Sequence, residues 1–178
     1  MILGMSTATF TLVHVVISLI GIFSGLVVLF GILGSRKTSG WTALFLVSTV
    51  LTSATGFFFH SASFGPAHVV GVTSLLVLAV AIIAVYILHL AGAWRWVYVV
   101  GAVVALYLNV FVSVVQAFQK LPLLQPLAPT QSEPPFLVVQ LIVVAIFILL
   151  GLLAVRRFHP KAVQRTTTYP SVPQSTKG

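Results

Sequence analysis

Five long apolar runs, none containing a charged side chain, dominate this 178-residue sequence. The runs occupy residues 10–33, 41–59, 67–90, 96–118 and 136–155. About 20 apolar residues in a helix span the hydrocarbon core of a bilayer. Backbone polar groups in lipid must be satisfied within a helix or a closed barrel, and unbroken apolar runs lack the alternation of barrel strands. The sequence therefore predicts an all-α, polytopic membrane bundle with five transmembrane helices.

The shortage of charged residues narrows the chemistry that this chain can perform. Hydrophobic residues make up 59% of it and charged residues 6%, whereas a soluble domain is roughly a quarter charged. A single acidic residue and no Cys exclude carboxylate-pair catalysis, acidic sites for Mg²⁺ or Ca²⁺, thiolate metal sites and iron–sulfur clusters. There is also no Gly-x-Ser-x-Gly motif and no Gly-rich phosphate loop. The sequence thus favours a non-enzymatic protein without deciding the question.

The basic residues predict the orientation of the chain in the membrane. If five helices alternate, eight of the nine Lys and Arg fall on one side and Lys120 alone on the other; the eight are Arg36, Lys37, Arg95, Arg156, Arg157, Lys161, Arg165 and Lys177. Because Lys and Arg gather on the cytoplasmic side, the N-terminus is expected outside and the C-terminus inside. Residues 1–157 would form the transmembrane domain, and residues 158–178, rich in Pro, Ser, Thr and basic residues, a disordered cytoplasmic tail.

The positions of the basic residues also indicate which partners to expect. They are scattered among helix ends and form no basic stripe with interleaved aromatic residues, so nucleic acid is not an expected partner. The expected partner is the lipid bilayer, and a second copy or another membrane protein stays open.

Small and polar residues recur at helical spacing and indicate which faces turn inward. His14, Ser18, Gly21 and Gly25 share one face of the first helix, and the two glycines form a GxxxG pattern that allows close approach of another helix. The fourth helix carries a similar stripe, made of Ala102, Ala105, Asn109, Ser113, Gln116 and Lys120. Because polar side chains facing acyl chains are costly, we expect these stripes to meet.

A possible internal duplication links the first and third helices. His14 and His68 are each followed by Val-Val, at an offset of 54 residues. The first four helices would then be two related hairpins, with the fifth alongside, and the two His would occupy equivalent places. Chance remains an equal explanation, since Val is abundant in this chain.

Two candidate sites lie toward the predicted outer side. His14 and His68, with His60, could bind a transition metal or the iron of a haem, because imidazole suits these ions. Asn109, Gln116 and Gln140 could instead line a pocket for a small polar headgroup or a quinone. The alternative for both sets is that the polar groups hold helices together through hydrogen bonds.

The Pro-rich segment between the last two helices is the most individual part of the chain. Five prolines in residues 121–135 predict a stiff, extended connection, and its apolar residues suggest that it lies on the membrane face. Glu133 could partner an outer His or Lys120, or the segment could be a plain linker.

This segment also carries a family resemblance. Together with Thr55-Gly56-Phe57 and Trp94-Arg95-Trp96, residues 116–140 resemble an uncharacterised group of small multi-pass bacterial membrane proteins. The resemblance covers residues 10–157 and implies an inner-membrane address but no activity or functional residues. The leading functional hypothesis is a His- and Gln-lined site near the outer leaflet, redox-linked through haem, metal or quinone. The alternative is a binding, transport or assembly subunit whose polar residues only pack helices.

Overall fold

The computed structural model of the chain describes residues 4–59 and 65–158, which form helices and no strand. The elements are α1 (Thr7–Leu33), α2 (Ser39–Gly56), α3 (Pro66–Ile82), a π-helix (Ile83–Ile87), α4 (Trp94–Lys120), a short 3₁₀ helix (Gln125–Leu127) and α5 (Pro134–Arg157). The expected all-α class is thus confirmed. The helix bounds lie within about three residues of the expected ones, except that the third helix changes to a π-helix at Ile83.

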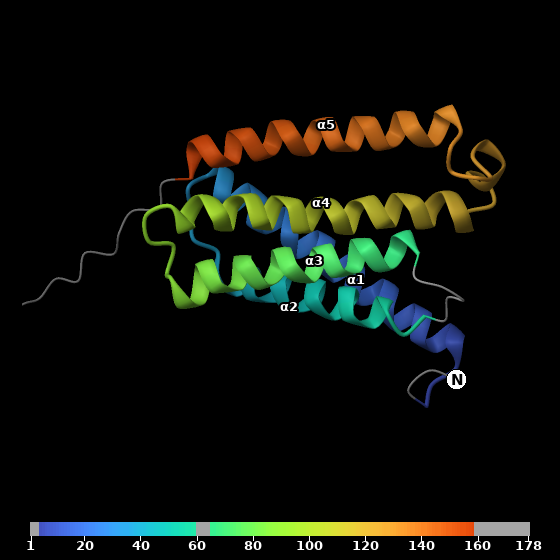
Figure 1. Cartoon of the computed structure of the whole chain (residues 1–178), viewed down its shortest axis with the longest axis horizontal. Coiled ribbons are helices and arrows are strands. Elements are labelled where there is room, and N and C mark those ends of the chain that lie inside the picture. Colours follow the sequence, from blue (N-terminus) through green and yellow to red (C-terminus); the bar gives the residue numbers. More distant parts are fainter. Residues whose placement is uncertain (1–3, 60–64, 159–178) are drawn as a thin grey trace, which may run out of the picture.

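Successive helices run in alternating directions and lie side by side (Figure 1). Helix α2 packs against α1 and α3, and α4 packs against α3 and α1. The first four helices thus enclose a common core, and α5 packs outside it against α4 and α1. Buried side chains of this core come from several helices, among them Leu29, Phe45, Leu78, Val99 and Leu106.

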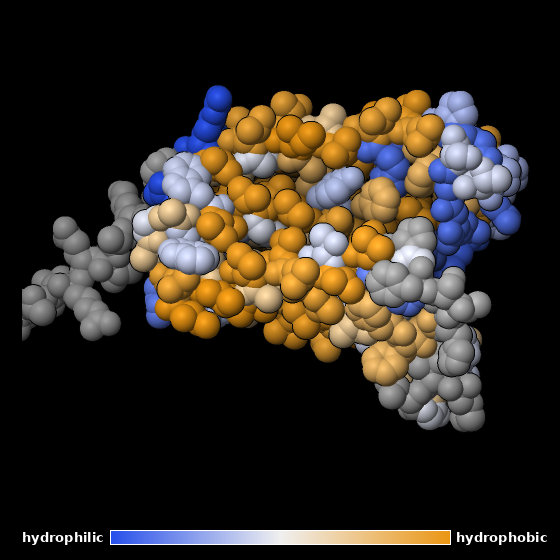
Figure 2. Space-filling view, viewed as in Figure 1, coloured by the Kyte–Doolittle hydropathy of each residue, from blue (hydrophilic) through white to orange (hydrophobic). Residues whose placement is uncertain are grey.

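Four of the helices are long and apolar enough to cross a membrane: α1, α3 with its π-helix, α4 and α5. Helix α2 is not apolar enough, because seven of its 18 residues are Ser or Thr. The surface supports a membrane environment, since many large apolar side chains of α5 point outward, including Leu141 at 65% and Leu149 at 61% exposure. Figure 2 shows that apolar residues cover the middle of the molecule, with hydrophilic residues at its two ends.

Because the helices alternate in direction, most of the basic residues lie at one end of the bundle. We call the end with Arg36, Lys37, Arg95, Arg156 and Arg157 the basic end, and the end with Lys120 and Glu133 the loop end. Of residues 158–178, the expected disordered tail, only Phe158 is described, and it is buried against the core; the rest, with its three basic residues, lies outside the described residues.

The GxxxG pattern of α1 marks its closest contact with other helices. A Cβ atom placed at Gly25 would lie 2.6 Å from Leu106 Cδ1 of α4 and 2.8 Å from Phe45 Cε2 of α2. One placed at Gly21 would lie 3.0 Å from Asn109 Nδ2. Both glycines are buried, so the predicted packing face of α1 is confirmed.

Candidate functional site

His14 joins α1 to α2. Its Nδ1 lies 2.7 Å from Thr55 Oγ1, and the Thr55 hydroxyl donates to the Leu51 carbonyl at 2.7 Å. Because the hydroxyl proton is used there, the imidazole Nδ1–H is the donor to the Thr55 oxygen. The His14 ring also meets the Phe59 ring edge to face, with ring centres 5.1 Å apart. His14 is therefore one member of a hydrogen-bond chain between two helices.

His68 has a different role at the start of α3. Its Nδ1 accepts a hydrogen bond from the Gly65 N–H at 3.2 Å, as the third residue of a capping box does. Its ring lies 5.8 Å from that of Phe57. The surroundings of His14 and His68 are thus not equivalent, because one imidazole reaches a neighbouring helix and the other bonds to the residue that caps its own helix.

The structure gives the metal or haem hypothesis no geometric support. Helices α1 and α3 lie on either side of α2, and His60 is outside the described residues. In residues 4–59 and 65–158, no group of three His, Cys, Asp or Glu side chains could hold a metal ion. Ligation by His14, His68 and His60 stays a prediction.

The polar stripes of α1 and α4 meet at Asn109. Asn109 is buried, and its Oδ1 accepts a hydrogen bond from Ser18 Oγ at 2.9 Å. Gly21 of α1 faces Asn109 Nδ2 and Thr49 Oγ1. Both atoms are buried and have no hydrogen-bond partner among the described residues. The expected convergence of polar residues is confirmed at this point.

The other two amides of the predicted polar pocket lie elsewhere. Gln140 of α5 donates from Nε2 to the Phe111 carbonyl of α4 at 3.3 Å, and its Oε1 is buried without a described partner. Gln116 is exposed at the surface of α4. Since Asn109 bonds to α1 and Gln140 comes from α5, the structure shows no single pocket that joins the three.

Glu133 is occupied within its own loop. Its Oε1 accepts from the Thr130 N–H at 3.1 Å and from the Thr130 hydroxyl at 2.8 Å, and its Oε2 accepts from the Ser132 N–H at 3.1 Å. Partial desolvation raises the pKa of Glu133, but these hydrogen bonds outweigh it and hold the pKa below its ordinary value. The described contacts pair the carboxylate with neither Lys120 nor His14.

A cavity of about 250 Å³ opens at the basic end, where α1, α2, the π-helix, α4 and the last described residue come together. Its floor is buried and consists of Ile32, Thr42, Tyr98 and Phe158. Thr42 Oγ1 and the Tyr98 hydroxyl lie 3.2 Å apart. Its exposed rim consists of Arg36, Lys37, Ser39, Tyr86 and His89, and Thr38, Val85 and Leu90 complete the lining.

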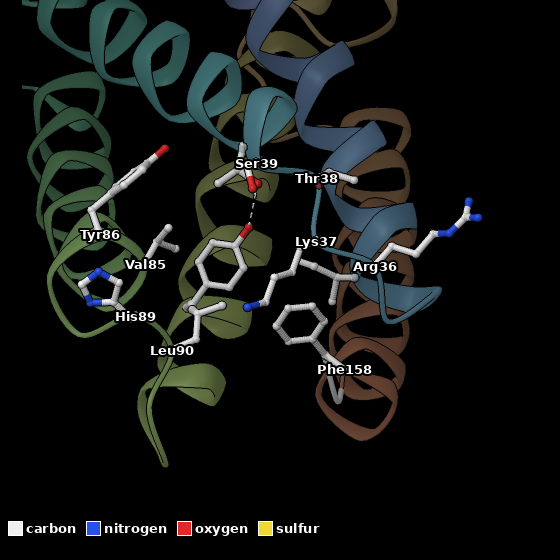
Figure 3. A pocket seen from close by; sticks show the side chains of 12 residues that line it. Arg36, Lys37, Thr38, Ser39, Val85, Tyr86, His89, Leu90 and Phe158 are labelled. Atoms are coloured by element: carbon white, nitrogen blue, oxygen red, sulfur yellow. Dashed lines mark hydrogen bonds between the residues drawn. The ribbon is translucent and has the colours of Figure 1, made fainter. Parts of the chain in front are cut away.

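Figure 3 shows how the two cations of the loop between α1 and α2 differ. The Lys37 side chain extends into the cavity, whereas the Arg36 guanidinium points away. The loop is fixed by the end of α1. Ser35 adopts φ 55°, its N–H donates to the Ile32 carbonyl at 2.9 Å, and the Arg36 N–H donates to the Gly31 carbonyl at 2.8 Å. This is the Schellman pattern, which places Lys37 directly after an ordered turn.

The opposite wall has an unusual backbone. The π-helix at Ile83–Ile87 supplies Val85 and Tyr86 to the lining, and His89 and Leu90 follow with φ of 50° and 60°. Left-handed conformations of residues other than Gly cost about 1–2 kcal/mol each. Both π-helices and such outliers concentrate at functional sites.

This cavity was not predicted from the sequence. In the sequence, Arg36 and Lys37 indicate only the orientation of the chain, and His89 belongs to no predicted site. The π-helix has no compositional signature, and the cavity depends on how five segments meet. The one available signal was the coincidence of His89, Arg36 and Lys37 at the same predicted end.

No protein-family model, no curated protein and no solved structure matches this chain. Its function must therefore be argued from its own residues.

Proposed function

We propose that this chain is a non-catalytic membrane protein, a binding or assembly subunit whose interior polar residues hold its helices together. One observation carries the proposal: interior polar groups are engaged in hydrogen bonds between helices. Ser18 bonds to Asn109, His14 to Thr55, Thr42 to Tyr98, Ser53 to Ser74, and Gln140 to Phe111. Each of these bonds joins two different helices, and only Asn109 Nδ2 and Gln140 Oε1 in this set are buried without a described partner.

We further propose that all five helices cross a bacterial inner membrane, with the N-terminus outside and the C-terminus inside. The basic end would then face the cytoplasm, as the distribution of Lys and Arg favours. Helix α2 is polar for a membrane span, but α1, α3 and α4 pack against it, and side chains of these helices bond to Thr55, Ser53 and Thr42. The inner-membrane address rests on the resemblance carried by residues 116–140.

A double-mutant cycle on Ser18 and Asn109 tests the packing role. Interhelical hydrogen bonds in membranes contribute on average about 0.6 kcal/mol and at most about 1.7 kcal/mol. We expect Ser18→Ala and Asn109→Ala to show a coupling energy in that range in equilibrium unfolding of the purified protein in mixed micelles. Thr11→Ala is the matched control, because the Thr11 hydroxyl bonds only to the Thr7 carbonyl of its own helix.

Absorbance and metal analysis of the same preparation test the rival redox function. We expect no Soret band and no stoichiometric metal, and we expect His14→Ala to lower stability without changing the spectrum. A cofactor that is lost on His14→Ala and His68→Ala would refute the non-catalytic proposal.

Labelling of introduced cysteines tests the orientation, because the natural chain has none. Leu123 is 82% exposed at the loop end, and a Cβ at Gly40 of the basic end would have no neighbour within 4 Å. In intact bacterial cells, Leu123→Cys should react with a membrane-impermeant maleimide, and Gly40→Cys only after permeabilisation. The reverse pattern, or labelling of both in intact cells, would refute the proposed arrangement.

A further inference from the structure

The cavity at the basic end has cations and no acid to balance them. The only acidic side chain in the chain is Glu133, which lies at the loop end and is bonded to Thr130 and Ser132. Lys37 extends into the cavity, and His89 stands on the rim. The side chains of this protein thus supply no negative charge to the cavity.

The polar lining suits an anion with several oxygen atoms. Thr38 and Ser39 contribute hydroxyl groups at the start of α2. No side chain caps this helix start, and the positive end of the helix dipole favours a negative charge there. His89 stands on the rim, where its Nδ1–H donates to the Ile87 carbonyl at 2.9 Å. Ammonium and hydroxyl groups together match the oxygens of a phosphate.

The apolar lining and the size favour a ligand that is only partly polar. Ile32, Val85, Leu90 and Phe158 form the apolar part of the wall. The volume of about 250 Å³ is below the roughly 300–1,000 Å³ of sites that enclose a whole small molecule. The cavity can thus hold a headgroup while the rest of the molecule remains outside. Tyr86, which lines the cavity and is 50% exposed, offers a largely apolar surface for that remainder.

From these features we infer that the cavity binds the phosphate group of an anionic phospholipid, with Lys37 as its cationic contact and the start of α2 as its hydroxyl donor. The inference goes beyond the proposed packing role but rests on the proposed membrane placement, which puts the basic end at the level of the headgroups. In this arrangement, the π-helix and the left-handed backbone of His89 and Leu90 open the cavity wall toward the lipid.

Fluorescence of the three tryptophans provides a local readout, because Trp41, Trp94 and Trp96 all lie at the basic end. The full chain in an uncharged detergent is titrated with dioctanoyl phosphatidic acid. Dioctanoyl phosphatidylcholine and inorganic phosphate are titrated in parallel. We expect saturable binding of phosphatidic acid, weaker binding of phosphatidylcholine, and binding of inorganic phosphate at least about tenfold weaker than that of phosphatidic acid.

Two substitutions in the same loop separate a site from general attraction by positive charge. Lys37→Gln should weaken the binding of phosphatidic acid about tenfold, since a hydrogen bond to a charged group contributes about 1.5–3 kcal/mol and 1.4 kcal/mol is a factor of ten. Arg36→Gln removes the same charge from a side chain that points away, and it should weaken binding less than about threefold. Lys120→Gln, at the loop end, controls for net charge.

A third variant tests the cavity itself. Val85→Phe keeps every charge but fills the space, and it should weaken binding as much as Lys37→Gln while circular dichroism shows an unchanged helix content. Equal losses for Lys37→Gln and Arg36→Gln, or unchanged binding by Val85→Phe, would overturn the site. Inorganic phosphate binding as tightly as phosphatidic acid would overturn the lipid assignment. The packing role is tested separately by the Ser18 and Asn109 cycle, whose residues do not line the cavity.

Discussion

The close approach of three helices at Gly25 leads to a quantitative prediction for Gly25→Ala. The added methyl group would lie 2.6 Å from Leu106 Cδ1 and 2.8 Å from two carbon atoms of the Phe45 ring. Carbon atoms that are not bonded prefer separations of about 3.5–4.0 Å, so the overlap is on the order of 1 Å on two sides. Either α1 must move away from both α2 and α4, or both side chains must move.

The burial of the two neighbours determines the size of the effect. Leu106 is 1% exposed and Phe45 is fully buried, so neither has free space to enter. Overpacking of this kind costs about 1–3 kcal/mol, and we place Gly25→Ala at the upper end. Replacing Gly by Ala inside a helix returns about 1 kcal/mol of helix propensity. The expected net loss is therefore about 2 kcal/mol of unfolding free energy.

Gly71→Ala in α3 is the matched control. A Cβ at Gly71 would lie 3.0 Å from Phe57 Cζ, but this is the far end of a ring that is 37% exposed and can turn away. We expect Gly71→Ala to be neutral or up to about 1 kcal/mol more stable than the natural chain. Unfolding in mixed micelles, followed by far-ultraviolet circular dichroism, measures both variants. If Gly25→Ala were as stable as Gly71→Ala, the packing of α1 against both α2 and α4 at this point would be wrong.

Three further predictions follow from individual contacts. Tyr98→Phe should lower the free energy of unfolding by about 0.5–1.5 kcal/mol, because it removes the bond to Thr42. Thr42→Val, introduced into the Tyr98→Phe variant, should cause little further loss of stability. Additive losses of the two variants in unfolding would exclude the bond. Gln140→Leu should change stability by less than about 1 kcal/mol in the same assay, because loss of the bond to the Phe111 carbonyl is offset by removal of Oε1, which is buried without a described partner. A loss above about 2 kcal/mol would show that this amide has contacts beyond the Phe111 carbonyl. The hydrogen bonds of Glu133 keep its pKa in the folded state low. The stability that the ionised carboxylate contributes is therefore complete above the ordinary carboxyl pKa and is lost as the pH falls through the lower folded value. Hydrogen exchange of the Thr130 and Ser132 amides, corrected for intrinsic rate, should accelerate over that range, and Glu133→Gln should reproduce the acceleration at neutral pH; unchanged exchange in the variant would contradict this.

Much of the architecture could be predicted because it depends on composition and helical spacing. Apolar length located the helices, and the spacing of His14, Ser18, Gly21 and Gly25 identified the face of α1 that packs. The same spacing in α4 placed Asn109 inward, where it meets Ser18. A helical period specifies a face, and faces of neighbouring helices must meet.

What the spacing could not supply was the partner of each polar group. His14 and His68 look alike in the sequence, yet one bonds across to Thr55 and the other back to Gly65. An outer His and Lys120 were among the partners considered for Glu133, but its donors are in its own turn, which a short loop places closer than any distant cation. The cavity was missed because the left-handed backbone at His89 and Leu90 follows from tertiary packing and not from local residue preferences.

The hydroxyl-rich composition of α2 has a consequence for how the chain is made. On its own, a helix with so many Ser and Thr residues would partition only weakly into a lipid phase, and its stability there depends on the helices around it. Helix α1 emerges from the ribosome first and offers His14 and its glycine face to α2. Synthesis should therefore deliver these two helices to the translocon as one hairpin, and a chain lacking residues 7–33 should leave α2 outside the bilayer even though every residue of α2 is intact.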